Sequence, residues 1–303
     1  MRRLSPEIPR RDQKIRATVA GVLVLLAVPG AASAAEADAV ARGAYLAAAA
    51  GCDQCHTDGA HGGAPYAGGR RFTDAYGTVI SPNITPDRAT GIGAWSDKDF
   101  VRAMRWGVAP DDSHYLPIFP FPFFNALSDA DLADLKSFLD SLPAVSRPDQ
   151  RAAEGLSLVA RAAAAVTVAA MPFAGPWHPD PAHDPVWNRG AYLVATVGRC
   201  ADCHTPRNRL GVPETDAFLA GTTSGPGGKK VPNITPDQKT GIGKWSEAEI
   251  AALLTDGETP DFDFVGGAMA EIVKNTARLT DPDRRAIAAF VKTVPAKPFA
   301  GKE

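Results

Sequence analysis

Two Cys-x-x-Cys-His motifs constrain this chain more than any other feature, because they hold all four of its cysteines. The first is Cys52-Asp-Gln-Cys55-His56 and the second is Cys200-Ala-Asp-Cys203-His204. Cysteines three positions apart are neighbours on one face of a helix, so both thiols can reach one partner. With a histidine directly after them, this spacing is typical of haem attachment through two thioether bonds.

A structural zinc site and a redox dithiol are the alternatives for these motifs. Zinc-binding pairs usually lie about 15–20 residues apart, whereas about 145 residues separate the pairs here. A redox dithiol is expected after a strand in a βαβ unit, but alanine-rich sequence that predicts helix precedes both motifs. The motifs therefore favour covalent haem c.

The predicted haem sites number two. Cys52 and Cys55 would attach the first haem c, with His56 as its proximal iron ligand. In the second site these roles fall to Cys200, Cys203 and His204. The other ring nitrogen of each histidine is expected to donate to a backbone carbonyl, because such a bond fixes the tautomer and orientation of an iron ligand.

The two motifs lie at matching places in an internal repeat. Four further segments recur at offsets that grow from 147 to 152 residues: 42–46 at 189–193, 83–87 at 233–237, 90–93 at 240–243, and 127–129 at 279–281. Only small insertions therefore separate the copies. A match at one long period predicts two copies of one folding unit.

Each copy predicts the same order of helices. A helix containing Tyr45 or Tyr192 runs into the motif, and a long loop rich in Gly and Pro follows. Two more helices then begin after hydroxyl N-caps, and the last one stops before a proline. These residues are Ser96, Ser128 and Pro143 in the first copy and Ser246, Thr280 and Pro295 in the second.

The N-terminal 34 residues read as an export signal. A basic stretch precedes the apolar run Ala17–Val28, and Ala32-Ser33-Ala34 is a small-residue cleavage site. The apolar run is short for a spanning helix, so we expect cleavage after Ala34 rather than an uncleaved anchor. Without this signal the chain has 26 basic and 32 acidic residues, a net charge of −6. This acidic balance disfavours nucleic acid as a partner.

The remaining chain divides into a first domain at 36–148, a connector at 149–181 and a second domain at 182–300. Within the connector, Leu156–Met171 is alanine-rich and apolar but carries Arg161 at its centre. It is too short and too charged to span a membrane. We expect a helix packed on one or both domains, with peripheral membrane association as the alternative. Pro172–Pro185 is expected to be extended.

The sixth iron ligand is where the two copies differ. Met269 lies 24 residues after Trp245, and the same count from Trp95 reaches Phe119. Met269 is therefore the predicted second axial ligand of the second haem, and a Met/His pair suits electron transfer. For the first haem three alternatives stand: His114, which is favoured; Met104, whose other interpretation is core packing; and a vacant position.

The repeated motifs resemble those of a known family. Arg-Gly-Ala-Tyr-Leu, Asn-Ile-Thr-Pro-Asp, Thr-Gly-Ile-Gly-x-Trp-Ser and Val265–Met269 are similar to segments of the cytochrome c subunits of bacterial membrane-bound alcohol and gluconate dehydrogenases and of related dihaem cytochromes. Those subunits usually carry three haems, whereas this sequence holds two motifs. The loop His114–Pro120 resembles the dihaem relatives more closely.

This resemblance implies a mainly α protein built as a tandem repeat of two class I cytochrome c-like domains. It also implies a bacterial periplasmic carrier, with inner-membrane association left open, that passes electrons from a periplasmic or membrane-bound dehydrogenase to a downstream acceptor of the respiratory chain. The alternative is a haem enzyme of the peroxidase or thiosulfate-oxidising type, acting at the first haem.

Overall fold

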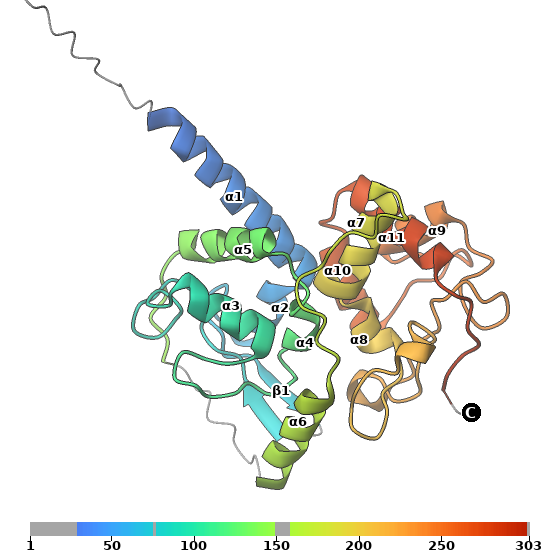
Figure 1. Cartoon of the computed structure of the whole chain (residues 1–303), viewed down its shortest axis with the longest axis horizontal. Helices are drawn as coiled ribbons and strands as arrows, with labels where there is room; N and C mark the ends of the chain where they lie inside the picture. Colours follow the sequence, from blue (N-terminus) through green and yellow to red (C-terminus); the bar gives the residue numbers. More distant parts are fainter. Residues whose placement is uncertain (1–28, 75–76, 149–157, 302–303) are drawn as a thin grey trace, which may run out of the picture.

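The computed structural model describes residues 29–74, 77–148 and 158–301. It consists of two helical domains that lie side by side (Figure 1). The first domain contains α1 (Pro29–Ala50), α2 (Cys52–His56), η1 (Gly59–His61), β1 (Arg71–Asp74), β2 (Gly77–Ile80), α3 (Asp97–Trp106), α4 (Phe121–Phe124) and α5 (Asp129–Ser141).

The second domain repeats this order after the connector helix α6 (Leu158–Ala170). The expected mainly α tandem repeat is therefore confirmed. The elements of the second domain are α7 (Pro185–Tyr192), η2 (Leu193–Val197), α8 (Cys200–His204), η3 (Thr215–Ala217), η4 (Pro226–Gly228), α9 (Glu247–Asp256), α10 (Gly267–Thr276) and α11 (Asp281–Thr293).

The predicted helix caps are present in both domains. Ser96 and Ser246 each form a capping box. The serine hydroxyl accepts from the backbone N–H of the third helical residue, and the acidic side chain of that residue accepts from the serine N–H. Ser128 and Thr280 cap α5 and α11 through their hydroxyls, which accept from the N–H of Asp131 and of Asp283. Both last helices end two residues before a proline, because the residue before proline is pushed into an extended conformation.

The first and last helices of each domain pack closely at a repeated glycine. A Cβ atom placed on Gly43 would lie 1.9 Å from the Asp134 carbonyl oxygen, and one on Gly190 would lie 1.9 Å from that of Ala286. Any side chain at Gly43 would push α1 away from α5, and any side chain at Gly190 would push α7 away from α11. The glycine of the Arg-Gly-Ala-Tyr-Leu repeat is thus required by helix packing.

The loop after the first motif contains a short hairpin that the sequence patterns did not predict. β1 and β2 pair antiparallel, with Arg71 opposite Ile80 and Phe72 opposite Val79. Its four-residue strands are too short for a clear alternating pattern. The equivalent loop of the second domain has isolated antiparallel bridges instead, Arg207 with Pro213 and Thr222 with Val231.

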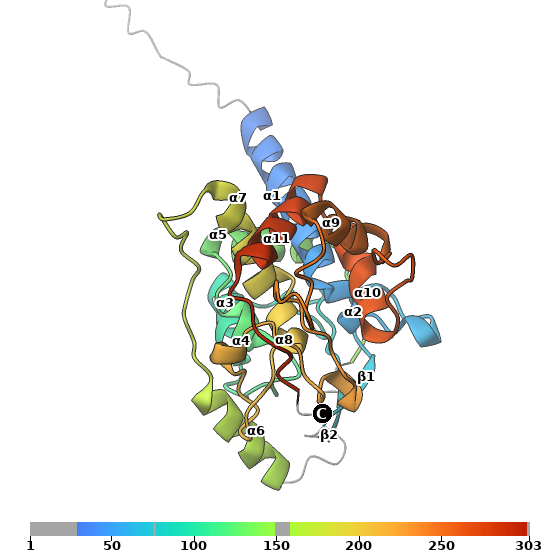
Figure 2. The same cartoon turned by 90° about the vertical axis from the view of Figure 1, so that its right-hand side faces the viewer.

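The connector helix is only loosely packed. Ala164 and Thr167 are buried, whereas Leu158 and Val159 are 85% and 78% exposed. Both views place α6 at the end of the molecule opposite the start of α1 (Figures 1 and 2). The extended segment after it is held on the first domain, since the Trp177 N–H donates to the Ala126 carbonyl at 2.9 Å.

The predicted export signal lies mostly outside the described residues. Helix α1 begins at Pro29 and runs through the expected cleavage site at Ala34 to Ala50. Among the residues that the structure describes, no helix combines the length and the apolar character that crossing a membrane requires.

Candidate haem sites

Both Cys-x-x-Cys-His motifs form a one-turn helix that begins after a residue in the left-handed conformation. Gly51, at φ 70°, precedes α2, and Arg199, at φ 50°, precedes α8. All four cysteines are free thiols. Burial raises the pKa of the Cys52 thiol to about 12 and that of Cys200 to about 11, so the apolar surroundings keep these sulfurs uncharged before attachment.

The motif histidines are oriented as an iron ligand requires. Nδ1 of His56 lies 2.9 Å from the Pro82 carbonyl oxygen, and Nδ1 of His204 lies 2.8 Å from that of Pro232. A carbonyl only accepts, so Nδ1 carries the proton and Nε2 keeps its lone pair for a metal. This predicted bond is confirmed in both copies. Burial also lowers the pKa of His204, which favours the neutral imidazole.

The repeated Asn-Ile-Thr-Pro-Asp loop fixes those prolyl carbonyls. Asn83 Oδ1 accepts from the N–H and hydroxyl of Thr85, while its Nδ2 donates to Thr90 Oγ1 and to the Val145 carbonyl. Asn233 makes the matching bonds to Thr235, Thr240 and Lys297. These asparagines satisfy loop backbone and tie the segment after the last helix to the loop that orients the histidine.

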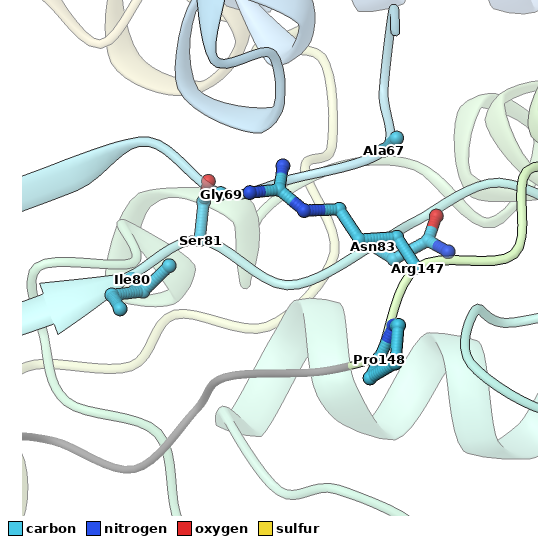
Figure 3. Close-up of a pocket in the computed structure, with 7 residues that line it drawn as sticks. All are labelled: Ala67, Gly69, Ile80, Ser81, Asn83, Arg147 and Pro148. Carbon is cyan, nitrogen blue, oxygen red and sulfur yellow. The ribbon is translucent and has the colours of Figure 1, made fainter. Parts of the chain in front are cut away.

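The first domain adds a further contact at this place. Figure 3 shows the Arg147 side chain extending from the segment after α5 toward Gly69. Its guanidinium donates to the Gly68 carbonyl, and Gly69, at φ 92°, has no side chain to obstruct it. Arg147 thus closes the loop that follows the first motif.

The loops that carry Phe119 and Met269 are in register. Val108 pairs with His114 in one hairpin and Glu258 pairs with Phe264 in the other, both at an offset of 150. The same offset carries Phe119 to Met269. Met269 lies in the first turn of α10, half-buried against the core. Phe119 instead belongs to an aromatic cluster with Tyr115, Phe121 and Phe124 at centroid distances of 5.7–6.4 Å.

The candidates for the other ligand of the first haem lie in different surroundings. His114 is exposed and lies in register with Phe264 rather than with Met269. Met104 is buried on α3 at the place that Leu254 takes on α9, where it packs in the core. Trp95 and Trp245 are half-buried and also pack against this core.

Two residues near the motifs were not singled out from the sequence. Tyr66 is half-buried, with φ 61°, and its ring lies 5.6 Å from that of Phe138. Burial raises the pKa of its phenol, and Cys52 adds to the effect. The other is Arg199. A comparison of the two repeats could have found Arg199, because the residue before the first motif is glycine and the residue before the second is arginine.

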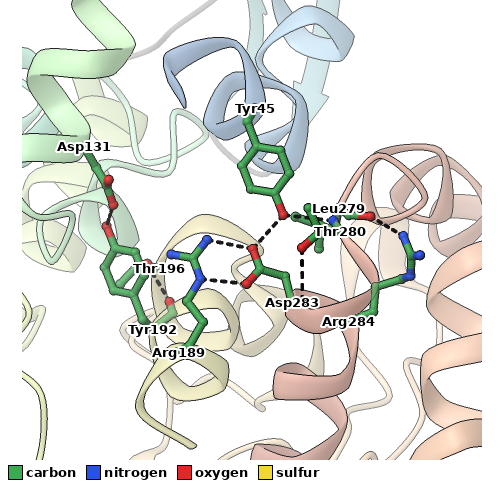
Figure 4. A network of polar contacts seen from close by, with 9 residues as sticks. All are labelled: Tyr45, Asp131, Arg189, Tyr192, Thr196, Leu279, Thr280, Asp283 and Arg284. Atoms are coloured by element: carbon green, nitrogen blue, oxygen red, sulfur yellow. Dashed lines mark hydrogen bonds and ion pairs between the residues drawn. The ribbon is translucent and has the colours of Figure 1, made fainter. Parts of the chain in front are cut away.

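Tyrosines of the Arg-Gly-Ala-Tyr-Leu repeat join the two domains reciprocally (Figure 4). The Tyr45 hydroxyl donates to Asp283 Oδ2 at 2.6 Å and accepts from the Thr280 N–H at 3.0 Å. The Tyr192 hydroxyl donates to Asp131 and accepts from the Ser128 N–H at 3.2 Å. Each domain thus places its tyrosine on the N-terminus of the other domain's last helix, as in a two-fold pair.

The first motif lies directly on the second domain. Asp53 forms an ion pair with Arg278 at 3.0 Å, and the Gln54 side chain bonds to the Glu271 carbonyl and to Asn275. All three partners lie on or just after α10, the helix that carries Met269. The first attachment site and the predicted ligand of the second haem therefore belong to one contact region.

The arrangement fits haem c and not a metal held by the four cysteines together. Within the described ranges, no three His, Cys, Asp or Glu side chains converge on a point that could hold a metal ion. Each thiol pair instead stands on one helical turn beside an imidazole whose Nδ1 is bonded to a prolyl carbonyl. That donor set suits one haem per domain.

This fold and this site define a cytochrome c. The Cytochrome c family model matches residues 40–143 and 188–295, and the chain belongs to this family.

Within this family, the chain is similar to a diheme cytochrome and to cytochrome subunits of dehydrogenases. A diheme cytochrome c-type protein of Cereibacter sphaeroides is 42% identical over 84% of this chain and 86% of its own length. The cytochrome subunit of fructose dehydrogenase from Gluconobacter japonicus is 35% identical over 87% of this chain, and the gluconate 2-dehydrogenase cytochrome c subunit of Pantoea cypripedii is 34% identical over 85%. The chain spans 54% and 60% of those two subunits.

Proposed function

We propose that this chain is an exported, periplasmic dihaem cytochrome c that carries electrons from a dehydrogenase towards the respiratory chain. When bound, haem iron supplies a one-electron couple. Cys52, Cys55 and His56 would hold the first haem c, and Cys200, Cys203 and His204 the second. The dehydrogenase partner is inferred from the relatives that are cytochrome subunits of fructose and gluconate dehydrogenases.

The observation that carries this proposal is the histidine geometry repeated in both domains. Each Nδ1 donates to a prolyl carbonyl within 2.9 Å, and each imidazole follows two thiols on one helical turn. Met269 would complete the second site with a soft thioether ligand, which raises the reduction potential and leaves no open position for a substrate.

Counting haems tests the proposal directly. The chain is expressed with a cytochrome c maturation system, and its covalent haem is measured by pyridine haemochrome and intact mass. We expect two haems per chain, and one in each of the double variants Cys52→Ser/Cys55→Ser and Cys200→Ser/Cys203→Ser. A wild-type chain that binds one haem or none in this assay would overturn the dihaem assignment.

Electron transfer is tested with a fructose or gluconate dehydrogenase from which its own cytochrome subunit has been removed. We expect substrate-dependent reduction of both haems in the purified dihaem protein. A fully loaded protein that accepts no electrons from any such dehydrogenase, yet is reduced by dithionite, would contradict the proposed partner class.

For the first haem we propose His114 as the second axial ligand of the iron. The hairpin between Val108 and His114 places this imidazole in the loop that precedes Phe119. His114→Ala should convert the first haem from low-spin to high-spin in the ferric spectrum, while Met104→Leu should leave it unchanged. An unchanged spectrum in His114→Ala would remove His114 as the ligand.

A second candidate function follows from Phe119. A phenyl ring cannot bind iron, so an open first site would allow peroxidase-type or thiosulfate-oxidising chemistry there. Cyanide and carbon monoxide distinguish the two functions: fast binding to one haem of the wild-type protein favours the enzyme, and slow or absent binding favours the carrier.

A further inference from the structure

Arg199 stands out because a long side chain occupies a strained backbone position. Its φ of 50° is left-handed, a conformation that residues other than glycine rarely adopt because it is strained for them. The equivalent residue of the first domain is Gly51, at φ 70°. A strained residue that glycine could replace without cost points to a role for its side chain.

The side chain reaches across the boundary between the domains. Nη2 donates to the Ala50 carbonyl at 3.2 Å, at the end of α1 and two residues before Cys52. The guanidinium carbon lies 5.3 Å from the centre of the Phe124 ring, on α4 of the first domain. Arg199 thus starts at the second attachment motif and ends at the first.

Its charge acts on both motifs. Arg199 directly precedes Cys200, and its guanidinium bonds to the Ala50 carbonyl two residues before Cys52, so it lies beside both attachment turns. Its charge also counteracts the rise in the pKa of the Cys52 and Cys200 thiols that burial causes. In the mature protein these sulfurs would be the thioether links at the rims of the two haems. One guanidinium would therefore face both rims.

This charge is poorly neutralised. Among the described residues Arg199 forms an ion pair only with Asp202, 3.5 Å from Nη1, and Asp202 also pairs with Arg207. Asp53 of the first motif pairs with Arg278 instead. The Arg199 side chain is 19% exposed, and no described residue gives its buried Nε a hydrogen-bond partner. A cation so placed is screened much less than one in water.

We propose that Arg199 is a shared cation between the two haem sites that raises the reduction potential of both. This inference rests on the proposed pair of haems. A ferric haem carries one positive charge more than a ferrous one, so a nearby cation disfavours the oxidised state by Coulomb repulsion. Because the same guanidinium faces both rims, its loss shifts the two potentials together.

The test removes the charge while keeping the backbone. Arg199→Asn and Arg199→Gly both tolerate a left-handed φ, and Arg199→Lys retains the charge. The two potentials are measured by spectropotentiometric titration, with EPR separating the haems. We expect both to fall in the Asn and Gly variants, and to stay close to wild type in the Lys variant.

Two matched controls each touch one site. Arg70 acts on Cys55 and bonds to the Gln54 carbonyl of the first motif. Arg207 acts on Cys203 and pairs with Asp202 of the second. Arg70→Gln should lower the first potential alone, and Arg207→Gln the second alone. The Arg70 effect should fade with added salt, since Arg70 is exposed, whereas the Arg199 effect should persist.

The possible results separate this inference from the proposed function. If Arg199→Asn moves one potential or neither while both haems are present, the shared-cation role is wrong. A variant that loses only thermal stability would show a structural role for the Ala50 and Phe124 contacts. If pyridine haemochrome instead finds fewer than two haems in the wild-type chain, the proposed function fails before this inference is tested.

Discussion

The two domains share the surface that would attach haem and differ on the surface that would face its other side. Both copies hold the motif histidine by a prolyl carbonyl, and both stabilise that carbonyl's loop with an asparagine. At the place proposed for the second axial ligand, the second domain has Met269 and the first has Phe119. On the proposed ligation, the two copies keep the same covalent attachment and differ in the axial ligand, which strongly tunes the reduction potential.

The largest effect is expected at Met269. Met269→Leu removes the proposed thioether ligand, and the potential of the second haem should fall on the order of 0.2 V, within the about 0.8 V that axial ligands span. The methionine-to-iron charge-transfer band should vanish, and the ferric second haem should bind cyanide quickly. Phe264→Leu, in the same loop, is the control and should leave the band in place. A band that survives Met269→Leu would assign this methionine to core packing instead.

Phe119→Met makes the reverse change. Because Phe119 and Met269 are in register, the new thioether should replace His114 at the first iron, raise its potential and produce a second charge-transfer band. Some loss of stability is expected, since Phe119 packs with Tyr115 and Phe124. A folded variant whose first potential and spectrum match the wild type would mean that the two loops diverge beyond the hairpin.

Most features that the two domains share could be predicted from the sequence, because an internal repeat lets one copy be aligned with the other. The motifs, helix order, caps and the histidine–carbonyl bond all followed from recurring residues and simple stereochemistry. The register of Phe119 with Met269 followed from a count of 24 residues after each tryptophan. These features are local, so short-range pattern was enough to find them.

The features that were missed depend on contacts between the copies. Tyr45 and Tyr192 were expected only to lie on the first helices, yet they bond to the other domain's last helix. Arg199 acts on cysteines that lie far from it in sequence. Nothing in either copy alone states how the copies pack, so these roles required the three-dimensional arrangement.

Removing the reciprocal tyrosine hydroxyls should have an intermediate effect. Tyr45→Phe and Tyr192→Phe each delete a hydrogen bond to a carboxylate, which should cost about 1.5–3 kcal/mol of unfolding free energy. The two losses should be similar if the domains are related by a two-fold axis. Denaturant titration followed at each haem measures them, and a large effect from one variant with none from the other would break the symmetry.

Low pH should weaken the contact that Tyr45 makes with Asp283 of the second domain. Burial tends to raise the pKa of Asp283, but the bonds from Arg189 and Tyr45 outweigh it and hold the pKa below its ordinary value. Its stabilising contribution is therefore complete above the unfolded pKa of about 3.9 and is lost as pH falls through the lower folded value. Asp283→Asn should abolish this part of the acid dependence, which is measured as unfolding free energy between about pH 5 and pH 2.

The smallest effects should be found at the helix caps, where the two domains do not differ. Ser96→Ala and Ser246→Ala each break a capping box built from the same bonds, with hydroxyl-to-backbone distances of 3.2 Å in both. Each should cost about 1 kcal/mol and leave both potentials unchanged, since neither serine contacts a motif. Equal losses would show that the helices of the two copies are energetically equivalent. The divergence between the domains would then lie in the haem ligands and in Arg199, and a cap variant that shifted a potential would contradict that separation.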